Sequence, residues 1–246
     1  MLRIEGLTIR AGARPIVEDV ALDLAEESLT CLIGPSGCGK TSVIRWLAGV
    51  LAPSLGAEGR VTLGGTPVVP PDRAIAYQPQ QDALLPWLTV AENAALGLSV
   101  RGLSRAEARA RVLPLLDSFG LAGTGDAFPA ALSGGMRQRA AFLRTIVQES
   151  RFVLLDEPFS ALDAVTRLTM QDWLAARLAE RPRGILMVTH DLHEATQMAD
   201  RIVVMAARPG RIVADIPIDT PRADRTEAAL AEVRTALKTR LMKDIT

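Results

Sequence analysis

The stretch Leu29-Thr-Cys-Leu-Ile-Gly-Pro-Ser-Gly-Cys-Gly-Lys-Thr41 decides the fold. It begins as a short apolar strand and continues as the pattern G-x-x-x-x-G-K-[ST], with a helical pattern after it. Glycines let such a loop wrap tightly, so that its amide N–H groups converge on phosphate oxygens. Lys40 would bring a positive charge to the β- and γ-phosphates, and Thr41 would offer a hydroxyl to Mg²⁺. The flanking strand and helix favour a nucleotide site over an ordinary glycine-rich turn. The predicted nucleotide-binding residues of this loop are Gly34, Pro35, Ser36, Gly37, Cys38, Gly39, Lys40, Thr41 and Ser42.

A second apolar strand ends in two carboxylates, in Phe152-Val-Leu-Leu-Asp156-Glu157. At the carboxyl end of a strand, Asp156 could hold Mg²⁺ through water, and Glu157 could polarise an attacking water molecule. A carboxylate pair in this position could also cap a helix. Together with the phosphate loop, the pair predicts hydrolysis of a nucleoside triphosphate.

Strands and helices alternate along most of the chain. Near-continuous apolar runs at 152–156, 184–190 and 202–206 predict buried strands, with helices over 41–51 and 164–180. This alternation predicts an α/β fold with a parallel sheet. Further strands are expected at 2–10, 20–24, 60–69 and 211–218.

Two other segments have a helical composition. Residues 88–147 are rich in alanine, and within them the stretch 104–120 predicts an amphipathic helix that begins with a capping box of Ser104 and Glu107. Residues 224–243 predict a terminal helix.

Composition excludes several classes of protein. Lys plus Arg and Asp plus Glu each number 28, so the net charge is zero, and a basic face for nucleic acid is not expected. Aromatic residues make up only 4%, which argues against a stacking platform for single strands. Cys31 and Cys38 do not suggest a disulfide framework. No apolar run approaches the roughly 18 residues of a membrane span, and the N-terminus lacks a secretory leader. We therefore expect a soluble, cytosolic protein.

The segment Leu132-Ser-Gly-Gly-Met-Arg-Gln138 resembles the signature sequence of ATP-binding cassette (ABC) ATPases. Three further motifs of that family match in the family's order. Gln80 matches the glutamine of the Q-loop, Ser160-Ala-Leu-Asp163 matches the D-loop, and His190 matches the switch histidine. With the phosphate loop and the carboxylates, the resemblance extends over nearly the whole chain.

The resemblance implies a P-loop NTPase (RecA-like) core with an N-terminal antiparallel β subdomain. It also implies an inserted helical subdomain at about 88–147, within an ATPase domain at 1–218, and a helical extension at 219–246.

The expected ligands are ATP and Mg²⁺. The resemblance implies Glu157, His190 and Gln80 as catalytic residues, and Thr41, Gln80 and Asp156 as the magnesium site. In the family, the signature residues act on ATP bound to the opposite subunit. That arrangement would place Ser133, Gly134 and Gly135 at the nucleotide of a second copy, and Asp163 of the D-loop is implied as a further nucleotide-binding residue.

One stretch departs from the family pattern. The family usually stacks adenine on an aromatic side chain in the first strand and turn, and Ala11 stands at the matching position. Arg10, Arg14 or Ile16 are the candidates to cover the base instead.

Two stretches resemble the nitrate/sulfonate/taurine importer group, which also includes transporters of pyrimidine vitamin precursors. They are Leu84-Leu-Pro-Trp-Leu-Thr-Val90 and Arg208-Pro-Gly-Arg-Ile212. The resemblance implies an ATPase subunit of an importer, peripheral on the cytoplasmic face of the inner membrane. Its partners would be a second copy and permease subunits, and indirectly a solute-binding protein, but no nucleic acid. In the family, the region after the Q-loop receives a short helix from the membrane subunit.

Alternative interpretations remain at this point. The Leu-Leu-Pro-Trp stretch could be core packing alone. The ATPase could serve an exporter or a lipid-extraction complex, or belong to the non-transport ABC proteins of DNA repair or translation.

Overall fold

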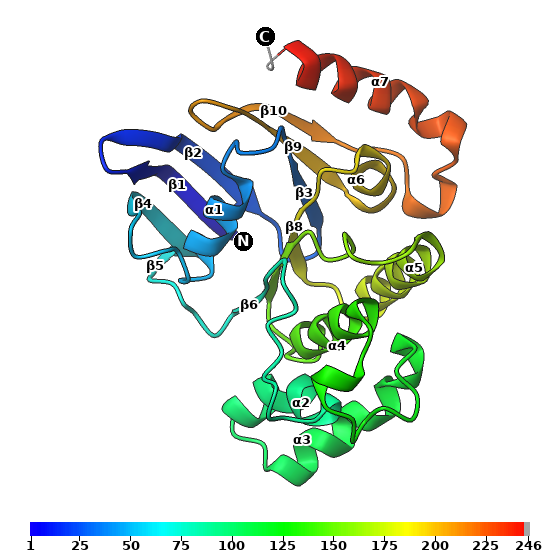
Figure 1. Cartoon of the computed structure of the whole chain (residues 1–246). Coiled ribbons are helices and arrows are strands. Elements are labelled where there is room, and N and C mark those ends of the chain that lie inside the picture. The colour runs from blue at the N-terminus through cyan, green and yellow to red at the C-terminus, as the bar shows by residue number, and fades with distance from the viewer. Residues whose placement is uncertain (244–246) are drawn as a thin grey trace.

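A six-stranded sheet forms the centre of the computed structural model, which describes residues 1–243 (Figure 1). Its strand order is β10-β9-β3-β8-β7-β6. Strands β9, β3, β8, β7 and β6 run parallel to one another, and β10 at the edge is antiparallel to β9. The parallel sheet confirms the predicted α/β class. The strands are β3 (Leu29–Ile33), β6 (Ile75–Gln78), β7 (Phe152–Asp156), β8 (Gly184–Val188), β9 (Arg201–Ala206) and β10 (Arg211–Pro217).

A second sheet is antiparallel and comes mainly from the N-terminal quarter of the chain. Its order is β2-β1-β4-β5, as the resemblance implied. Long strands pair here because apolar residues alternate along them, from Leu2 and Ile4 on one strand to Leu22 and Leu24 on the next. The strands are β1 (Leu2–Ala11), β2 (Arg14–Leu24), β4 (Gly56–Leu63) and β5 (Thr66–Val68).

Alternate residues of the parallel strands pack into two different hydrophobic cores, one on each face of the sheet. Leu154, Leu186 and Val203 join the core that also contains the inner face of the antiparallel sheet and α1 (Lys40–Leu47). Val153 and Ile185 point to the other face, where they join the core beneath the remaining helices. The central sheet is therefore covered on both faces, which explains its continuously apolar strands.

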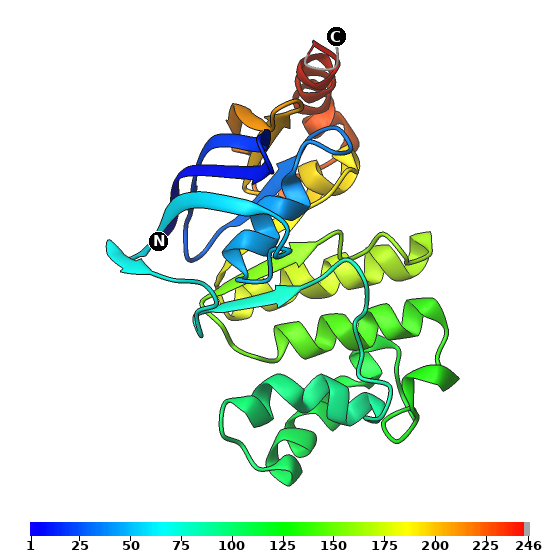
Figure 2. The same ribbon diagram turned by 60° about the vertical axis from the view of Figure 1, so that its left-hand side comes forward.

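The remaining helices lie mostly on the second face of the sheet. A capping box of Thr89 and Glu92 starts the first of them, and the predicted box of Ser104 and Glu107 starts the next. In Figure 2, α5, α4 and the pair α2 and α3 lie one below another under the sheet. The helices are α2 (Val90–Val100), α3 (Arg105–Val112), α4 (Gly134–Ile146), α5 (Ala164–Glu180), α6 (Leu192–Met198) and α7 (Glu227–Lys243).

Several local predictions need correction. Helix α1 ends at Leu47 rather than Leu51, because the N–H groups of Gly49 and Val50 turn back to the carbonyls of Trp46 and Arg45. The expected amphipathic helix over 104–120 stops at Val112 and continues as short 3-10 turns at Leu113–Leu115 and Asp117–Phe119. Pro114 lacks the N–H that a continuing α-helix needs.

Strand β6 and helix α6 were not predicted, because each is short and its apolar pattern is weak. The predicted helical extension at 219–246 contains α7, but residues 244–246 lie outside the described part of the chain.

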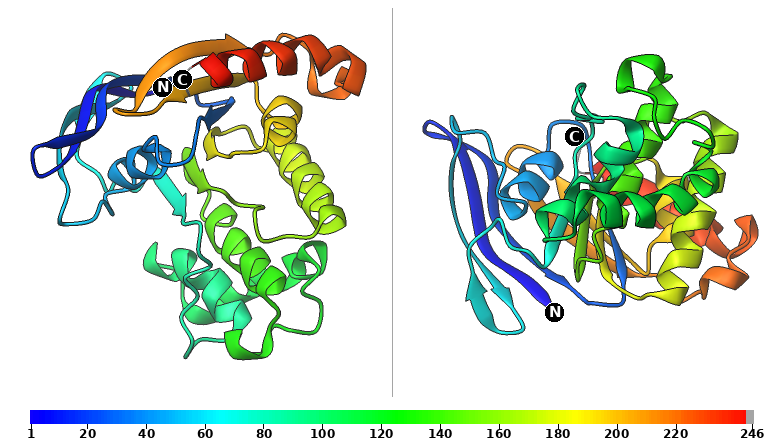
Figure 3. Two further views of the ribbon diagram at one scale, coloured as in Figure 1. Left: turned by 45° about the horizontal axis from the view of Figure 1, so that its top comes forward. Right: turned by 90° about the horizontal axis from the view of Figure 1, so that it is seen from below.

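The two sheets and the stacked helices form two arms in the left view of Figure 3. Within residues 1–243, no helix is both long and apolar enough to cross a membrane.

Candidate active site

The loop between β3 and α1 encloses the amine of Lys40. Its Nζ lies 2.8 Å from the carbonyl oxygen of Gly34 and 3.1 Å from that of Pro35, so the cation sits at the centre of the loop. At Gly39, φ is +99° and a Cβ would lie 2.5 Å from Cγ2 of Val17, so only glycine fits against β2. The loop therefore offers a buried cation and backbone amides to an anionic group.

Thr41 and Asp156 form an oxygen pair beside this loop. The hydroxyl of Thr41 donates to Oδ1 of Asp156 at 3.1 Å, and the hydroxyl of Tyr77 lies 3.5 Å from Oδ2. The side chain of Asp156 is fully buried, and burial raises the pKa of this carboxyl. Hydroxyl and carboxylate oxygens are the ligands that a small hard cation prefers.

Glu157 is the centre of a second cluster. Its Oε2 accepts a hydrogen bond from Nε2 of Gln80 at 3.1 Å and lies 3.4 Å from Nδ1 of His190. The backbone of Glu157 has φ of +49°, and its N–H donates to the carbonyl of Val188. A left-handed non-glycine residue marks local strain that the surrounding structure must hold, here at the end of β7. A cavity of about 50 Å³ borders Glu157 and His190, which is enough room for a water molecule.

The structure thus brings together the phosphate loop, Asp156, Glu157, Gln80 and His190. It does not bring Ser133, Gly134 or Gly135 of the signature to this place. Ser133 caps α4 by accepting from the N–H of Met136, and no hydrogen bond within residues 1–243 joins Ser133, Gly134 or Gly135 to the phosphate loop. Their surfaces are exposed or half-exposed.

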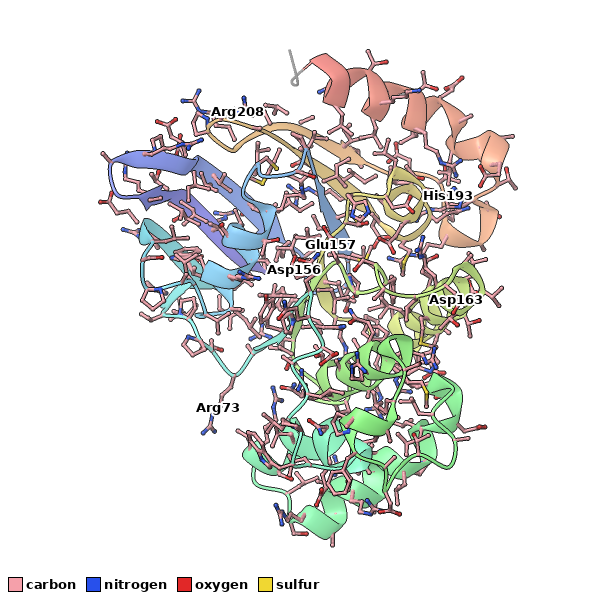
Figure 4. The ribbon with its side chains drawn as sticks, in the orientation of Figure 1. Arg73, Asp156, Glu157, Asp163, His193 and Arg208 are labelled. Carbon is pink, nitrogen blue, oxygen red and sulfur yellow. The ribbon has the colours of Figure 1, made fainter. Side chains whose placement is uncertain are left out.

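Asp163 also lies apart from the carboxylate cluster. Figure 4 shows Asp156 and Glu157 side by side near the middle of the molecule, with Asp163 well to one side at the start of α5. The side chain of Asp163 accepts hydrogen bonds from Thr166, and these hydrogen bonds lower the pKa of Asp163. Within the described chain, its role is that of a helix cap.

Two residues that sequence reasoning did not assign also belong to the site. Gln138 is buried, and its Nε2 reaches the carbonyls of Gln80 at 3.4 Å and Pro158 at 3.3 Å. It therefore ties the start of α4 to both loops that flank Glu157. Tyr77 was missed because it lies on the unpredicted strand β6, whereas Gln138 stood in the quoted signature without a role.

Strand β2 and the loop after β9 support the phosphate loop from behind. The N–H of Gly210 donates to the carbonyl of Ile16, and the N–H of Glu18 donates to the carbonyl of Gly210. A Cβ on Gly210 would lie 2.0 Å from the carbonyl oxygen of Cys38, so this loop touches the phosphate loop directly. Ala11 is exposed at the end of β1.

Comparison with known proteins identifies the family. A family model described as ABC transporter matches residues 17–160, more than half of the chain. The chain belongs to the ABC transporter family. This match confirms the resemblance inferred from the signature motif, and the chain is an ABC ATPase that binds and hydrolyses ATP.

Curated relatives of this ABC ATPase come from several bacteria. The aliphatic sulfonates import ATP-binding protein SsuB 2 of Burkholderia cenocepacia is 41% identical over 227 residues, which cover 92% of this chain and 82% of that protein. The taurine import ATP-binding protein TauB of Mesorhizobium japonicum is 46% identical over 201 residues, covering 81% of this chain and 76% of that protein.

Solved ABC structures show the same fold. A dimeric ATP-binding cassette in a post-hydrolysis state, bound to ADP and Pi, matches with a TM-score of 0.78 and 26% identity. The match covers 90% of this ABC ATPase and all of that chain.

Proposed function

We propose that this ABC ATPase energises the import of a small organic sulfonate, of the taurine or alkanesulfonate type, through partner permease subunits. The relatives named for sulfonate and taurine import support the substrate class. The observation that carries the hydrolytic part is the Glu157 cluster. Its carboxylate is held by Gln80 and stands beside His190, one residue beyond the Asp156–Thr41 pair.

Mg²⁺ fits the oxygen pair of Thr41 and Asp156, with Gln80 as a further ligand. Within residues 1–243, no group of three or more His, Cys, Asp or Glu side chains could hold a metal ion. Magnesium sites that use one or two carboxylates together with substrate phosphates need no such group. When bound, Mg²⁺ would neutralise charge on the β- and γ-phosphates. Asp156 would then be held as a carboxylate despite its burial.

The residues of the cluster divide the chemistry of hydrolysis. Lys40 would exchange its contacts with the loop carbonyls for contacts with phosphate oxygens, because the charge-assisted contact is stronger. Glu157 would accept a proton from the attacking water, which Gln80 and His190 help to position. The strained backbone of Glu157 aims its side chain into the same small cavity.

A second copy of the chain would complete the site. Ser133 and the amides of Gly134 and Gly135 lie at the N-terminus of α4, where the helix dipole favours an anion. They are exposed and distant from the phosphate loop of their own chain, so a γ-phosphate held by Lys40 of another copy is the group they suit. Asp163 would approach the same nucleotide. The dimeric state of the similar cassette supports this arrangement.

The loop after Gln80 is suited to hold a permease. Trp87 is 69% exposed, although it is among the largest apolar side chains. The loop behind it is held rigidly, because the buried side chain of Asn93 bonds to the backbone of Leu85, Leu88 and Thr89. We assign Trp87 as an anchor for a membrane subunit. The ATPase would therefore sit peripherally at the cytoplasmic face of the inner membrane. The permease would receive solute from a solute-binding protein on the opposite side of that membrane.

The test is taurine and ethanesulfonate uptake by cells that express this ATPase together with its partner permease subunits. Uptake of either solute that is lost with Glu157→Gln supports the proposal. Retained ATPase activity without uptake of either solute would contradict the substrate class.

The permease contact is tested separately with Trp87→Ala, with Val69→Ala as a control because Val69 is an apolar residue elsewhere that is even more exposed, at 87%. We expect Trp87→Ala to reduce co-purification with the permease and transport, while the isolated ATPase activity and the melting temperature stay unchanged. A lowered melting temperature would instead mean that Leu-Leu-Pro-Trp is core packing.

A further inference from the structure

A cavity of about 480 Å³ lies between α3, α4 and α5. None of the nucleotide-site residues lines it, and it is about ten times larger than the cavity beside Glu157. Figure 2 shows these three helices following one another below the sheet, so the cavity joins the helical segment to the catalytic core. Its size is in the range of small-molecule sites.

The charge of this cavity is strongly positive. Four arginines line it against a single carboxylate, Glu149. Arg181 is paired with Glu149 at 2.5 Å, and Arg177 is paired with a residue outside the lining. Among the ion pairs of residues 1–243, neither Arg111 nor Arg183 has a carboxylate partner. A concave site with charge of one sign concentrates the opposite charge.

Arg183 is the buried member of this set. Only 7% of the residue is exposed, and its Nη1 donates to the carbonyl of Ile146 at 3.1 Å. Burial lowers the pKa of Arg183, and the charges of Arg177 and Arg181 lower it further while Glu149 opposes them. The guanidinium nevertheless stays charged, because arginine is not deprotonated in proteins. A buried cation without a counter-charge is costly, so an anion here would stabilise the protein.

The rest of the lining is apolar. Leu143, Ile146 and Trp173 face the cavity from α4 and α5. Trp173 is held in place by two phenyl rings, with ring centroids 4.4 Å from Phe119 and 6.1 Å from Phe142. A rigid indole beside a group of guanidinium donors suits a ligand with one charged end and one apolar end.

We propose that this cavity binds a small organic anion, with its oxyanion head on Arg111, Arg177 and Arg183 and its apolar part on Trp173. The planar guanidinium matches carboxylate, sulfonate or phosphate oxygens in a two-pronged geometry. Such a ligand bridges α3 of the helical segment and the core, and so reports on their relative position. The site does not depend on the transport function proposed above.

The experiment is calorimetric titration of the whole chain with hexane-1-sulfonate, in the presence of saturating ADP and Mg²⁺ to occupy the phosphate loop. We expect saturable binding that Arg111→Met and Arg177→Met each weaken by at least about tenfold, the size of one charge-assisted hydrogen bond. Arg105→Met is the matched control, because Arg105 is exposed on the same helix α3 but does not line this cavity.

Hexan-1-ol and inorganic sulfate test the two ends of the ligand, and each should bind at least about tenfold more weakly than the sulfonate. Equal binding of either probe would overturn the proposal. So would displacement of the sulfonate by ADP, an equal loss in Arg105→Met, or no binding at all. Melting temperatures of the variants show whether each one is folded. Arg111→Met and Arg177→Met are two independent tests of the sulfonate contact.

Discussion

The two phosphate-directed parts of this ABC ATPase differ in how completely the chain satisfies them. Around the phosphate loop, the side chains of Lys40, Thr41 and Glu157 already have partners within hydrogen-bond distance. At the start of α4, Ser133 and Gly134 are exposed and Gly135 is half-exposed, and the hydroxyl of Ser133 bonds only within its own first turn. We call the first region, with Lys40, Thr41 and Glu157, the prepared half-site. The second region, residues 133–135 at the start of α4, has no side-chain contact of this kind beyond the first turn of α4 within the described chain.

This difference supports the proposal that two copies together form the catalytic unit. Preorganised donors lose little when the substrate arrives, whereas an exposed helix N-terminus gains its effect only when an anion is brought to it. The γ-phosphate would then join two copies until it is hydrolysed. In this proposal, loss of the γ-phosphate would weaken the contact between the copies, and hydrolysis would thereby cause a movement.

The largest expected effect is that of Glu157→Gln on the prepared half-site. The amide keeps the shape and the hydrogen bond to Gln80, but it cannot accept a proton. Phosphate release should fall by about 10²–10⁴-fold, the usual contribution of a general base, while ATP binding persists. Steady-state phosphate release measures this, with the exposed Glu5→Gln as control. A variant that retains more than about a tenth of the rate would exclude Glu157 as the base.

Lys40→Ala changes the same half-site by weakening its affinity for ATP. The amine is the one cation that the loop encloses, so its loss should weaken ATP binding by about 10–100-fold and stop hydrolysis. Nucleotide titration of this variant beside the exposed Lys238→Ala makes the comparison. Unchanged affinity would remove the phosphate-loop assignment.

Ser133→Arg breaks the outward-facing region alone. In the Glu157→Gln background the chain should be monomeric without nucleotide and dimeric with ATP. The added arginine puts a bulky cation where close approach is needed, so it should abolish the dimer and leave ATP binding to the monomer nearly intact. Size-exclusion chromatography with and without ATP measures dimer formation, and nucleotide titration measures ATP binding to the monomer. If the double variant still dimerises, Ser133 does not act across the interface.

Gly210→Ala sharpens the comparison by disturbing the support of the phosphate loop. The new Cβ would stand 2.0 Å from the carbonyl of Cys38, so the backbone has to move. Overpacking of this kind costs about 1–3 kcal/mol, and we expect a lower melting temperature together with weaker ATP binding. Gly56→Ala is the matched control, since a Cβ there meets nothing within 4 Å. Equal melting temperatures for both variants would show that the backbone near Gly210 and Cys38 can move apart without a cost in stability.

Asp156→Asn gives the smallest effect, on stability. Burial raises the pKa of Asp156 in the folded chain, so the unfolded chain releases this proton at a lower pH. Stability therefore falls as the pH rises from about 4, the ordinary value for Asp, through the folded pKa. The neutral amide should raise the melting temperature at pH 7, and the gain should shrink towards pH 4. A gain that does not change with pH would contradict burial as its cause.

Much of the fold follows from signals that lie within a few residues. The phosphate loop, the apolar strand that ends at Asp156, and the helix over 164–180 were each predicted from spacing and polarity. The predicted bounds of that helix agree with α5 at both ends. Strand β6 escaped prediction because four residues, two of them only half-buried, carry too weak a pattern.

The functional site divides in the same way. The identities of Lys40, Asp156 and Glu157 could be inferred from local motifs, because each motif carries its own chemistry. The bridging of two loops by Gln138 could not be inferred, since its partners Gln80 and Pro158 lie 58 and 20 residues away.

By itself, the sequence determined the parallel α/β class, the phosphate loop and the family, since glycine spacing, strand polarity and the signature are local properties of the chain. Only the tertiary structure decided which of those groups meet. The hydroxyl of Thr41 reaches Asp156 across 115 residues, and one cavity is lined both by Arg111 of α3 and by Arg183 of the segment between α5 and β8. Such meetings depend on how helices and sheets pack, and packing is set by the whole core at once.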